Sequence, residues 1–258
     1  TLDHLLVQLN KSIRLDFLIF CALVEERSPY IVLHEGGKLV VRGNLECFDI
    51  SIGDRKGSVI LLPKMGLVNA AAAAAVSIER YRPKVVAMSG ICGGFAPRAH
   101  MGQLFISEMA YEYQSGKWSD DGFLQEPYQA TTDQQTITML GLLANRVGLL
   151  SDLESGFTGT RPAEQHVPSI GIFTSGSAVI ASKVLLDQVG QIHRKVHALD
   201  MEVYAIQRAA QLAPHRPSTI CAKTVVDLCD NNKNDKIHAY GSYVSAKFVV
   251  YALEQFLA

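Results

Sequence analysis

Apolar residues occur in short continuous runs along this chain. Runs of this length predict β-strands that are buried on both faces, as in parallel sheets. The runs cover residues 15–23, 84–88, 104–107, 169–174 and 219–226. Two further segments, residues 51–54 and 58–62, predict a hairpin around residues 54–57. Residues 84–88 lead into a segment with three glycines, residues 89–94, which we predict to be a turn.

Between these strands, apolar residues recur at helical spacing. Asn69 is the predicted N-cap of a helix over residues 70–81, which contains six consecutive alanines. The alanine run is either a low-complexity stretch or a surface on which a neighbouring element packs closely, and the sequence leaves both open. Further helices are expected over residues 134–147, 181–189, 201–212 and 240–256.

Strands that alternate with helices predict an α/β fold with a twisted, largely parallel central sheet flanked by helices. Residues 1–14 are predicted to be an N-terminal helix or linker. The remaining residues, 15–258, contain no repeat and no long linker, so we expect them to form one domain. The chain begins at Thr1 rather than Met, which suggests a segment of a longer polypeptide.

Composition narrows the class of protein. Hydrophobic residues make up 48% of the 258 and charged residues 19%, which predicts a buried core and not disorder. The net charge of −1 gives no reason to expect a nucleic-acid or anionic-membrane surface. No apolar run approaches the roughly 20 residues of a membrane span. Five scattered cysteines predict reduced thiols in a cytoplasmic protein.

Carboxylates follow several of the predicted strands. Glu25 and Glu26 come after the first strand, Glu202 lies just before a helix, and Asp227 ends the last strand. Ligands of α/β sheets bind beyond the carboxyl ends of the strands, so these side chains are candidates for one site. Each carboxylate taken alone is more often a helix cap or a solvated loop residue.

Three carboxylates suit the cleavage of an N-glycosidic bond. One can protonate the departing base, a second can hold the ribose hydroxyls and stabilise positive charge on the sugar, and a third can take a proton from attacking water.

Together these segments resemble the purine nucleoside phosphorylase superfamily, and most closely its methylthioadenosine/S-adenosylhomocysteine nucleosidase branch. The motif set also resembles bacterial nucleosidase domains that are fused to signalling or immune modules, some of which destroy adenine nucleotides such as ATP. The resemblance extends over residues 15–257. Its matching segments are residues 22–26, 64–66, 89–94, 174–178, 199–206 and 225–230.

The resemblance implies a role for individual residues. Glu26 matches the carboxylate that activates water, Glu202 the one that holds the ribose hydroxyls, and Asp227 the acid that protonates the purine ring nitrogen. The expected substrate-binding residues are Met65, Gly90, Ile91, Cys92, Gly93, Ser177, Ala178, Val179, Met201, Lys223, Lys233, Lys236 and His238. Lys223 stands where a basic residue often supports the carboxylates.

Two departures from the family pattern bear on the reaction. Ile91 replaces a small hydroxyl residue, which removes a hydrogen bond that orients the acid. Ala87 stands where many phosphorylases carry a phosphate-binding arginine, which favours water over phosphate as the nucleophile. Residues 230–239 are polar and include Lys233, Lys236 and His238, which suits a 5′-phosphate better than a thioether; the alternative is a solvated turn.

We therefore predict hydrolytic release of adenine from a nucleoside or nucleotide, with a phosphorylated 5′ end (AMP or ATP) preferred. The alternatives are a methylthioadenosine/S-adenosylhomocysteine nucleosidase, a phosphorolytic enzyme, and a catalytically silent nucleoside-binding module. No cofactor is expected, and no metal, because His193 and His197 lack the intervening acidic residue of a zinc motif.

The resemblance also suggests a homodimer or higher homo-oligomer, fusion to a sensor domain and a role in antiviral defence. The aromatic residues of segment 111–118 suggest a base platform or a subunit contact.

Overall fold

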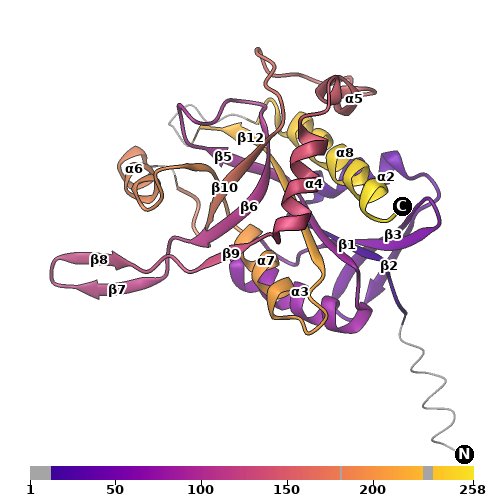
Figure 1. Ribbon diagram of the computed structural model, residues 1–258, viewed down its shortest axis with the longest axis horizontal. Helices are drawn as coiled ribbons and strands as arrows, with labels where there is room; N and C mark the ends of the chain where they lie inside the picture. Colours follow the sequence, from indigo (N-terminus) through magenta and orange to yellow (C-terminus); the bar gives the residue numbers. More distant parts are fainter. Residues whose placement is uncertain (1–12, 181, 229–234) are drawn as a thin grey trace, which may run out of the picture.

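The computed structural model describes residues 13–180, 182–228 and 235–258. In this part of the chain a ten-stranded sheet is flanked by helices, and a separate two-stranded arm projects from one end (Figure 1). The strands of the sheet are β1 (Phe17–Cys21), β2 (Lys38–Arg42), β3 (Leu45–Ile52), β4 (Arg55–Leu61), β5 (Val85–Gly94), β6 (Leu104–Glu112), β9 (Gln129–Thr131), β10 (Ser169–Ser175), β11 (Val196–Asp200) and β12 (Ser218–Asp227).

The helices are α2 (Val24–Leu33), α3 (Leu67–Tyr81), α4 (Gln134–Ala144), α5 (Leu149–Glu154), α6 (Lys183–Gln191), α7 (Val203–Leu212) and α8 (His238–Phe256). The arm consists of β7 (Gly116–Ser119) and β8 (Gly122–Gln125). Among the described helices, none combines the length and the apolar character that crossing a bilayer requires.

The α/β architecture is confirmed, and the sheet is mixed. Strand β1 lies between β4 and β5 in parallel, and β5 continues in parallel to β12. Strand β12 pairs antiparallel with β6. Strand β6 pairs in parallel with β10, and β10 pairs in parallel with β11. Strand β11 then pairs antiparallel with β5, so five strands form a closed ring. This closure brings the ends of β5, β11 and β12 together.

Both faces of the sheet are covered, which explains the continuous apolar runs. In β1, Phe17 and Ile19 pack into a core with α2, α4, α5 and α8, whereas Leu18 and Phe20 pack into a second core with α3 and α7. A third cluster joins α6 to β10 and β11. A strand buried on both sides has no polar face, so alternation is not expected.

The alanine run of α3 is a packing surface. Helix α3 packs against α7, and Ala70, Ala73 and Ala74 are buried there near Ala205 and Ala210 of α7. Small side chains let the two helix backbones approach closely. The close-packing interpretation of the alanine run is therefore favoured.

The start of α3 differs from the prediction. The N-cap is Gly66, at a φ of 109°, and not Asn69. The backbone N–H groups of Gly66 and Leu67 donate to Glu202 Oε1 and Ser177 Oγ, at 3.0 and 3.1 Å. Because distant side chains satisfy these N–H groups, no local capping residue is needed.

Other boundaries also differ. Residues 89–94, predicted to be a turn, continue strand β5, because Gly93 and Gly94 pair with Leu199 and Ala198 of β11. The predicted hairpin is confirmed with longer strands, and its turn lies at Gly53, which has a φ of 59°. The four later helices are confirmed within a few residues for their described parts. Helix α2, the arm, β2, β9 and α5 were not predicted, and residues 1–12 lie outside the described residues.

Candidate active site

A cavity of about 210 Å³ opens where β5, β11 and β12 end near the start of α2 and α3. Its polar lining consists of Glu26, Asp200, Glu202, Lys223, Asp227 and His238. The remaining lining residues are Ala22, Leu23, Met65, Ile91, Cys92, Gly93, Ala178, Val179, Ile180, Leu199, Met201 and Val226. The cavity thus combines an apolar wall with a few convergent charged groups, as ligand sites usually do.

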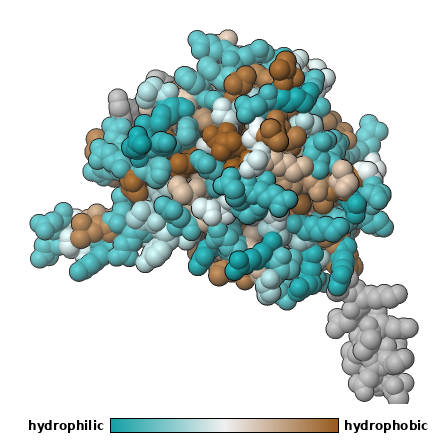
Figure 2. Space-filling view, in the orientation of Figure 1, coloured by the Kyte–Doolittle hydropathy of each residue, from teal (hydrophilic) through white to brown (hydrophobic). Residues whose placement is uncertain are grey.

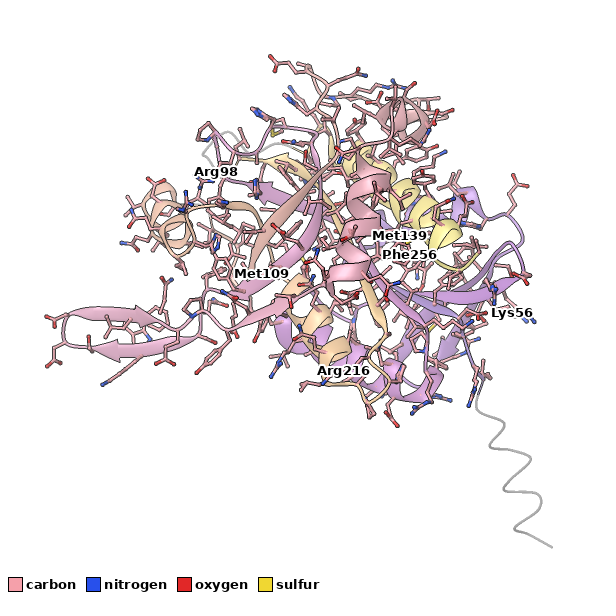
Figure 3. The ribbon with its side chains drawn as sticks, viewed as in Figure 1. Lys56, Arg98, Met109, Met139, Arg216 and Phe256 are labelled. Atoms are coloured by element: carbon pink, nitrogen blue, oxygen red, sulfur yellow. The ribbon has the colours of Figure 1, made fainter. Side chains whose placement is uncertain are left out.

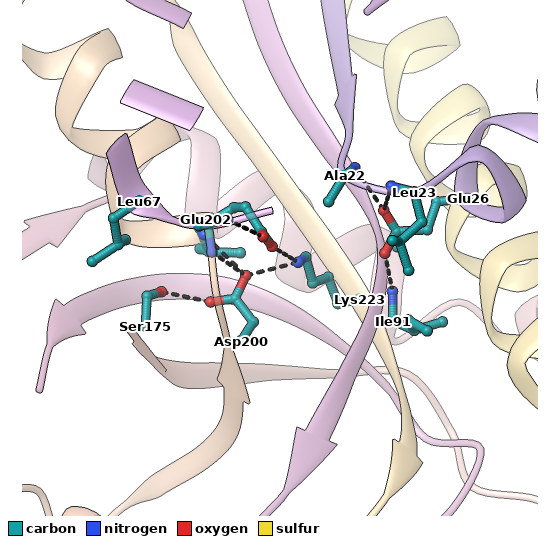
Figure 4. A network of polar contacts seen from close by, with 12 residues as sticks. Ala22, Leu23, Glu26, Leu67, Ile91, Ser175, Asp200, Glu202 and Lys223 are labelled. Carbon is teal, nitrogen blue, oxygen red and sulfur yellow. Dashed lines mark hydrogen bonds and ion pairs between the residues drawn. The ribbon is translucent and has the colours of Figure 1, made fainter. Parts of the chain in front are cut away.

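Glu26 is held rigidly at the first turn of α2. Its Oε2 accepts hydrogen bonds from the backbone N–H groups of Ala22 (2.7 Å) and Leu23 (3.0 Å), and its Oε1 accepts one from Ile91 (3.0 Å; Figure 4). Only 1% of its surface is exposed. Burial raises the pKa of Glu26 to about 7, although Lys223 opposes the shift. A carboxyl group with this pKa can exchange a proton near neutral pH.

Lys223 of β12 lies between two carboxylates. Its Nζ is 2.8 Å from Asp200 Oδ2 and 2.8 Å from Glu202 Oε2, and all three side chains are buried (Figure 4). Burial alone would lower the pKa of Lys223, but Asp200, Glu202 and Glu26 raise it well above its ordinary value. The ammonium group therefore stays charged and compensates part of the negative charge of the cavity.

Asp200 fixes the start of α7. Its Oδ2 accepts hydrogen bonds from the N–H groups of Glu202 (3.1 Å) and Val203 (2.9 Å), and Ser175 Oγ donates to its Oδ1 at 2.5 Å. Ser175 and Asp200 are register partners on β10 and β11. Glu202 is thereby held from both sides, since its own Oε1 accepts from Gly66 N–H. The Glu202 carboxylate therefore joins α3, α7 and β12. Its remaining lone pairs can accept hydrogen bonds from hydroxyl groups in the cavity.

Two further groups lie at the end of β12 and the start of α8. Asp227 is the last residue of β12 and pairs in register with Gly93. His238 opens α8, and its Nδ1 lies 3.1 Å from Glu25 Oε1. Both residues line the cavity, so Asp227 shares it with Glu26 and Glu202 and comes from a third element.

The structure brings most of the predicted site residues together. Glu26, Glu202 and Asp227 line the cavity, as do the expected substrate-binding residues Met65, Ile91, Cys92, Gly93, Ala178, Val179, Met201, Lys223 and His238. Their roles in binding stay predictions.

Three of the expected substrate-binding residues lie outside the cavity lining, and a fourth is not among the described residues. Gly90 lies behind Glu26 and outside the cavity lining. Ser177 is exposed, and its Oγ accepts from Leu67 N–H, so it supports α3. Lys236 is exposed and is not part of the lining. Lys233 lies outside the described residues.

One of the two departures from the family pattern needs correction. Ala87 is completely buried in the middle of β5, between β1 and β12, and does not line the cavity. Its small side chain therefore says nothing about which nucleophile enters. The consequence of Ile91 for the acid Asp227 stays a prediction; at Ile91 the backbone N–H donates to Glu26 Oε1 at 3.0 Å.

Sequence reasoning missed Asp200 and Ser175 as supports of the site. Asp200 carried a signal, since it directly precedes Met201 and Glu202 at a strand end. Ser175 carried none, because its contact with Asp200 depends on how β10 and β11 are paired. Among the described residues, no group of three or more His, Cys, Asp and Glu side chains is placed to hold a metal ion.

The Glu26 carboxylate occupies space that a side chain at position 90 would fill. A Cβ on Gly90 would lie 2.1 Å from Glu26 Oε1, which is far inside van der Waals contact. We expect Gly90→Ala to lower the free energy of unfolding by about 1–3 kcal/mol, because Glu26 must leave its three N–H donors or β5 must shift. Chemical denaturation measures this change.

Gly141 in α4 is the matched control. A Cβ there meets nothing within 4 Å, so Gly141→Ala should raise the free energy of unfolding by about 0.5–1 kcal/mol. Equal effects of the two substitutions would contradict the close approach of Gly90 and Glu26.

Comparison with known proteins places this architecture in a family. The model of the phosphorylase superfamily matches residues 17–246. The protein y4jS of Sinorhizobium fredii is 34% identical over 203 residues, which cover 77% of this chain and 49% of that protein. ATP nucleosidase Cap17 of Escherichia coli is 26% identical over 212 residues, which cover 76% of this chain and 41% of that protein. The chain thus spans at most about half the length of these curated relatives.

A solved structure agrees with the fold. The 5′-methylthioadenosine/S-adenosylhomocysteine nucleosidase of Neisseria meningitidis, in complex with methylthio-immucillin-A, superposes with a TM-score of 0.75. Its sequence is 17% identical, and the alignment covers 93% of this chain and 98% of the other. At this identity the likeness shows the fold alone. The family model, which spans most of the chain and includes every described strand and the start of α8, shows that this protein belongs to the phosphorylase superfamily.

Proposed function

We propose that this chain hydrolyses the N-glycosidic bond between adenine and the ribose of a nucleoside or nucleotide. The observation that carries the proposal is the meeting of Glu26, Glu202 and Asp227 on one cavity, each from a different element and in different surroundings. Acid–base cleavage of a glycosidic bond requires carboxyl groups in different roles, one that donates a proton and one that accepts a proton.

In the proposed reaction the bond from the anomeric carbon to the purine nitrogen breaks as a water oxygen bonds to that carbon. Glu26, in its ionised form, takes one proton from the water. Asp227 gives one proton to a ring nitrogen of the departing base, so the leaving group is neutral adenine. Glu202 accepts hydrogen bonds from the ribose hydroxyls and stabilises the positive charge that develops on the sugar. One proton is taken up and one is given, so the net charge of the site is unchanged.

The charges of the cavity favour water over phosphate as the nucleophile. Of the described residues that line it, Lys223 is the only lysine or arginine, and it is already engaged by Asp200 and Glu202. A phosphate dianion would approach Glu26 and Glu202 with no uncommitted lysine or arginine among these residues to bind it. Water carries no such penalty.

Relatives with this type of activity support the proposal. The names of an Escherichia coli relative and of a structural neighbour describe an ATP nucleosidase and a methylthioadenosine/S-adenosylhomocysteine nucleosidase. Both names denote release of a base from an adenine-containing compound. The proposal extends that chemistry to this chain, together with a homo-oligomeric state, a cytoplasmic location and fusion to a signalling domain.

Chromatography for free base tests the substrate class. The protein is incubated separately with adenosine, AMP, ATP, methylthioadenosine, S-adenosylhomocysteine and inosine. We expect adenine to be released from at least one adenine compound and inosine to be a poor substrate. Release of hypoxanthine alone would contradict the assignment to adenine. Tight nucleoside binding with no release would leave the silent binding module as the better description.

For the 5′ end we propose a preference for phosphate, supported by His238 in the cavity lining and by the name of the Escherichia coli relative. We expect Lys233→Ala with Lys236→Ala to lower the ratio of kcat/KM for ATP to that for adenosine by about tenfold or more, because each ammonium group can bind a phosphate oxygen. Lys38→Ala, on β2, is the control. An unchanged ratio in the double variant would refute the phosphate pocket without touching the nucleosidase proposal.

A further inference from the structure

One of the three hydrogen bonds to the Glu26 carboxylate comes from a peptide group that is itself held from behind. The N–H group of Ile91 donates to Glu26 Oε1 at 3.0 Å (Figure 4). The C=O group of the same peptide belongs to Gly90, and it accepts a hydrogen bond of 2.7 Å from Ser245 Oγ of α8. The C=O and N–H groups of a trans peptide point in opposite directions, so Ser245 and Glu26 bind its two ends.

A third side chain extends this row of hydrogen bonds. Thr224 of β12 lies with its Oγ1 2.8 Å from Ser245 Oγ. A serine hydroxyl has one hydrogen, and Ser245 gives its hydrogen to Gly90 O, so Thr224 is the donor in this contact. The three donors therefore point the same way, from Thr224 through Ser245 and the peptide group towards the Glu26 carboxylate.

Both hydroxyl groups are shielded from solvent. Hydrophilic side chains cover most of the face shown in Figure 2, but the polar residues Thr224 and Ser245 have no exposed surface. Bulk water therefore does not compete for their hydrogen bonds. In such surroundings, aligned hydrogen bonds polarise and strengthen one another. The polarised N–H group of Ile91 is a stronger donor, which favours a carboxylate over the neutral carboxylic acid.

Helix α8 gives Ser245 a fixed position. Val244 and Phe248, on either side of it in the sequence, are buried in the core on one face of the sheet. Phe256, labelled in Figure 3, packs on the same core at the far end of the helix. Thr224 is fixed by the parallel pairing of β12 with β5. The two hydroxyl groups are therefore in place before any ligand enters the cavity.

We propose that Ser245, supported by Thr224, is a positioning residue that aims the Ile91 N–H group at Glu26 and stabilises the ionised form of this carboxyl group. Ser245 does not line the cavity, so it acts on the reaction through the peptide group alone. Its importance for the general base rests on the proposed function, whereas its effect on the ionisation of Glu26 does not.

Other groups around Glu26 also act on its charge. Burial and Glu202 oppose ionisation, Lys223 favours it, and the pKa of Glu26 is raised to about 7 as a result. The other titratable groups that interact with Glu26 or share its cavity are Cys21 on β1, Tyr30 on α2, Cys92 on β5, Asp200 on β11, Asp227 on β12 and His238 on α8. All of these groups remain in the variants below, so a changed titration of Glu26 reports on the row of hydrogen bonds.

Carbon-13 NMR of protein labelled at the glutamate carboxyl carbon follows the ionisation of Glu26 directly, and the spectrum of Glu26→Gln identifies its signal. We expect Ser245→Ala to raise the pKa of Glu26 by about 0.5 unit or more, because the Ile91 N–H group becomes a weaker donor. Thr224→Val is nearly isosteric and removes only the outermost donor. It should therefore give a smaller shift in the same direction.

Ser242→Ala, one turn earlier on α8, is the matched control. Ser242 is 1% exposed, and its Oγ has no hydrogen-bond partner among the described residues. Its removal deletes a buried hydroxyl from the same helix without touching the row of hydrogen bonds. The titration of Glu26 should therefore be the same as in the unmodified protein.

The pH profile of adenine release gives a second reading. In Ser245→Ala the rise of the rate should move to higher pH by the same amount as the titration. The rate at about pH 6 should then fall about threefold or more, while KM stays the same because Ser245 does not touch the cavity.

An unchanged titration of Glu26 in Ser245→Ala, or an equal shift in Ser242→Ala, would overturn the proposal. If Ser245→Ala fails to fold, Thr224→Val decides in its place, since a shift supports the proposal and an unchanged titration overturns it. A shifted titration in a protein that releases no adenine would support the role of Ser245 and refute the proposed hydrolysis.

Discussion

Glu26→Gln should lower the rate of adenine release by about 10²–10⁴-fold, the range that a positioned general base contributes. The amide is nearly isosteric but cannot take a proton from water. Its NH₂ group must also face at least one of the three N–H donors that hold the carboxylate, so one hydrogen bond is lost. Glu35→Gln, at an exposed position just beyond α2, is the control and should leave the rate unchanged.

The rate of adenine release should depend on pH in one direction. Burial raises the pKa of Glu26 to about 7, and the proposed base is the ionised form. The rate in the unmodified protein should therefore rise as pH increases through about 7 and be lost below it. Glu26→Gln should show no such rise in its residual activity. If Glu26→Gln stayed within about threefold of the unmodified rate, Glu26 could not be the base.

Lys223→Met should lower the free energy of unfolding by about 3–5 kcal/mol, the usual cost of breaking a buried ion pair. Lys223 Nζ lies 2.8 Å from a carboxylate oxygen of Asp200 and 2.8 Å from one of Glu202. The substitution leaves both carboxylates buried without this shared cation. For a chain of this size the loss corresponds to a fall in Tm of about 6–20 °C. Differential scanning calorimetry measures it.

Two variants make the origin of the effect clear. Lys56→Met removes an exposed lysine of β4 and should leave Tm nearly unchanged. Adding Asp200→Asn and Glu202→Gln to Lys223→Met removes the uncompensated charges and should recover part of the loss. A Tm for Lys223→Met within about 2 °C of the unmodified protein would show that the triad does not stabilise the fold.

The strands that the sequence predicts best are those buried on both faces, because a short continuous apolar run such as that of β1 is typical of a strand covered on both sides. Helix α2 escaped prediction because it contains Glu25, Glu26 and Arg27 in sequence and a proline inside, so no apolar stripe marks it. Its inward face is functional and partly charged, as Glu26 shows. A helix that presents a carboxylate to a site lacks the pattern on which helix prediction depends.

The glycine segment after residue 88 shows a second limit. Three glycines predict a turn, yet here they let a strand continue past Glu26 and pair with β11. The need for glycine arises from residues that are distant in sequence. Local propensity cannot reveal such a contact.

The candidate site was predictable where carboxylates end strands and was hidden where it depends on strand pairing. Glu26, Glu202 and Asp227 stood out at strand ends, and the structure brings them to one cavity. The support of Asp200 by Ser175 follows from the register of β10 and β11, which the sequence does not show. Ala87 was used as an argument for water as the nucleophile, and that argument failed. A position near a motif in sequence need not face the cavity.

Adenine release in phosphate-free buffer tests the central claim most directly. We predict that the unmodified protein converts adenosine or an adenine nucleotide to equal amounts of adenine and free sugar. Added phosphate should not change the rate, and Asp227→Asn should abolish release while the protein stays folded. No release from any adenine nucleoside or nucleotide, or release that needs phosphate and yields a sugar 1-phosphate, would contradict hydrolysis at this site.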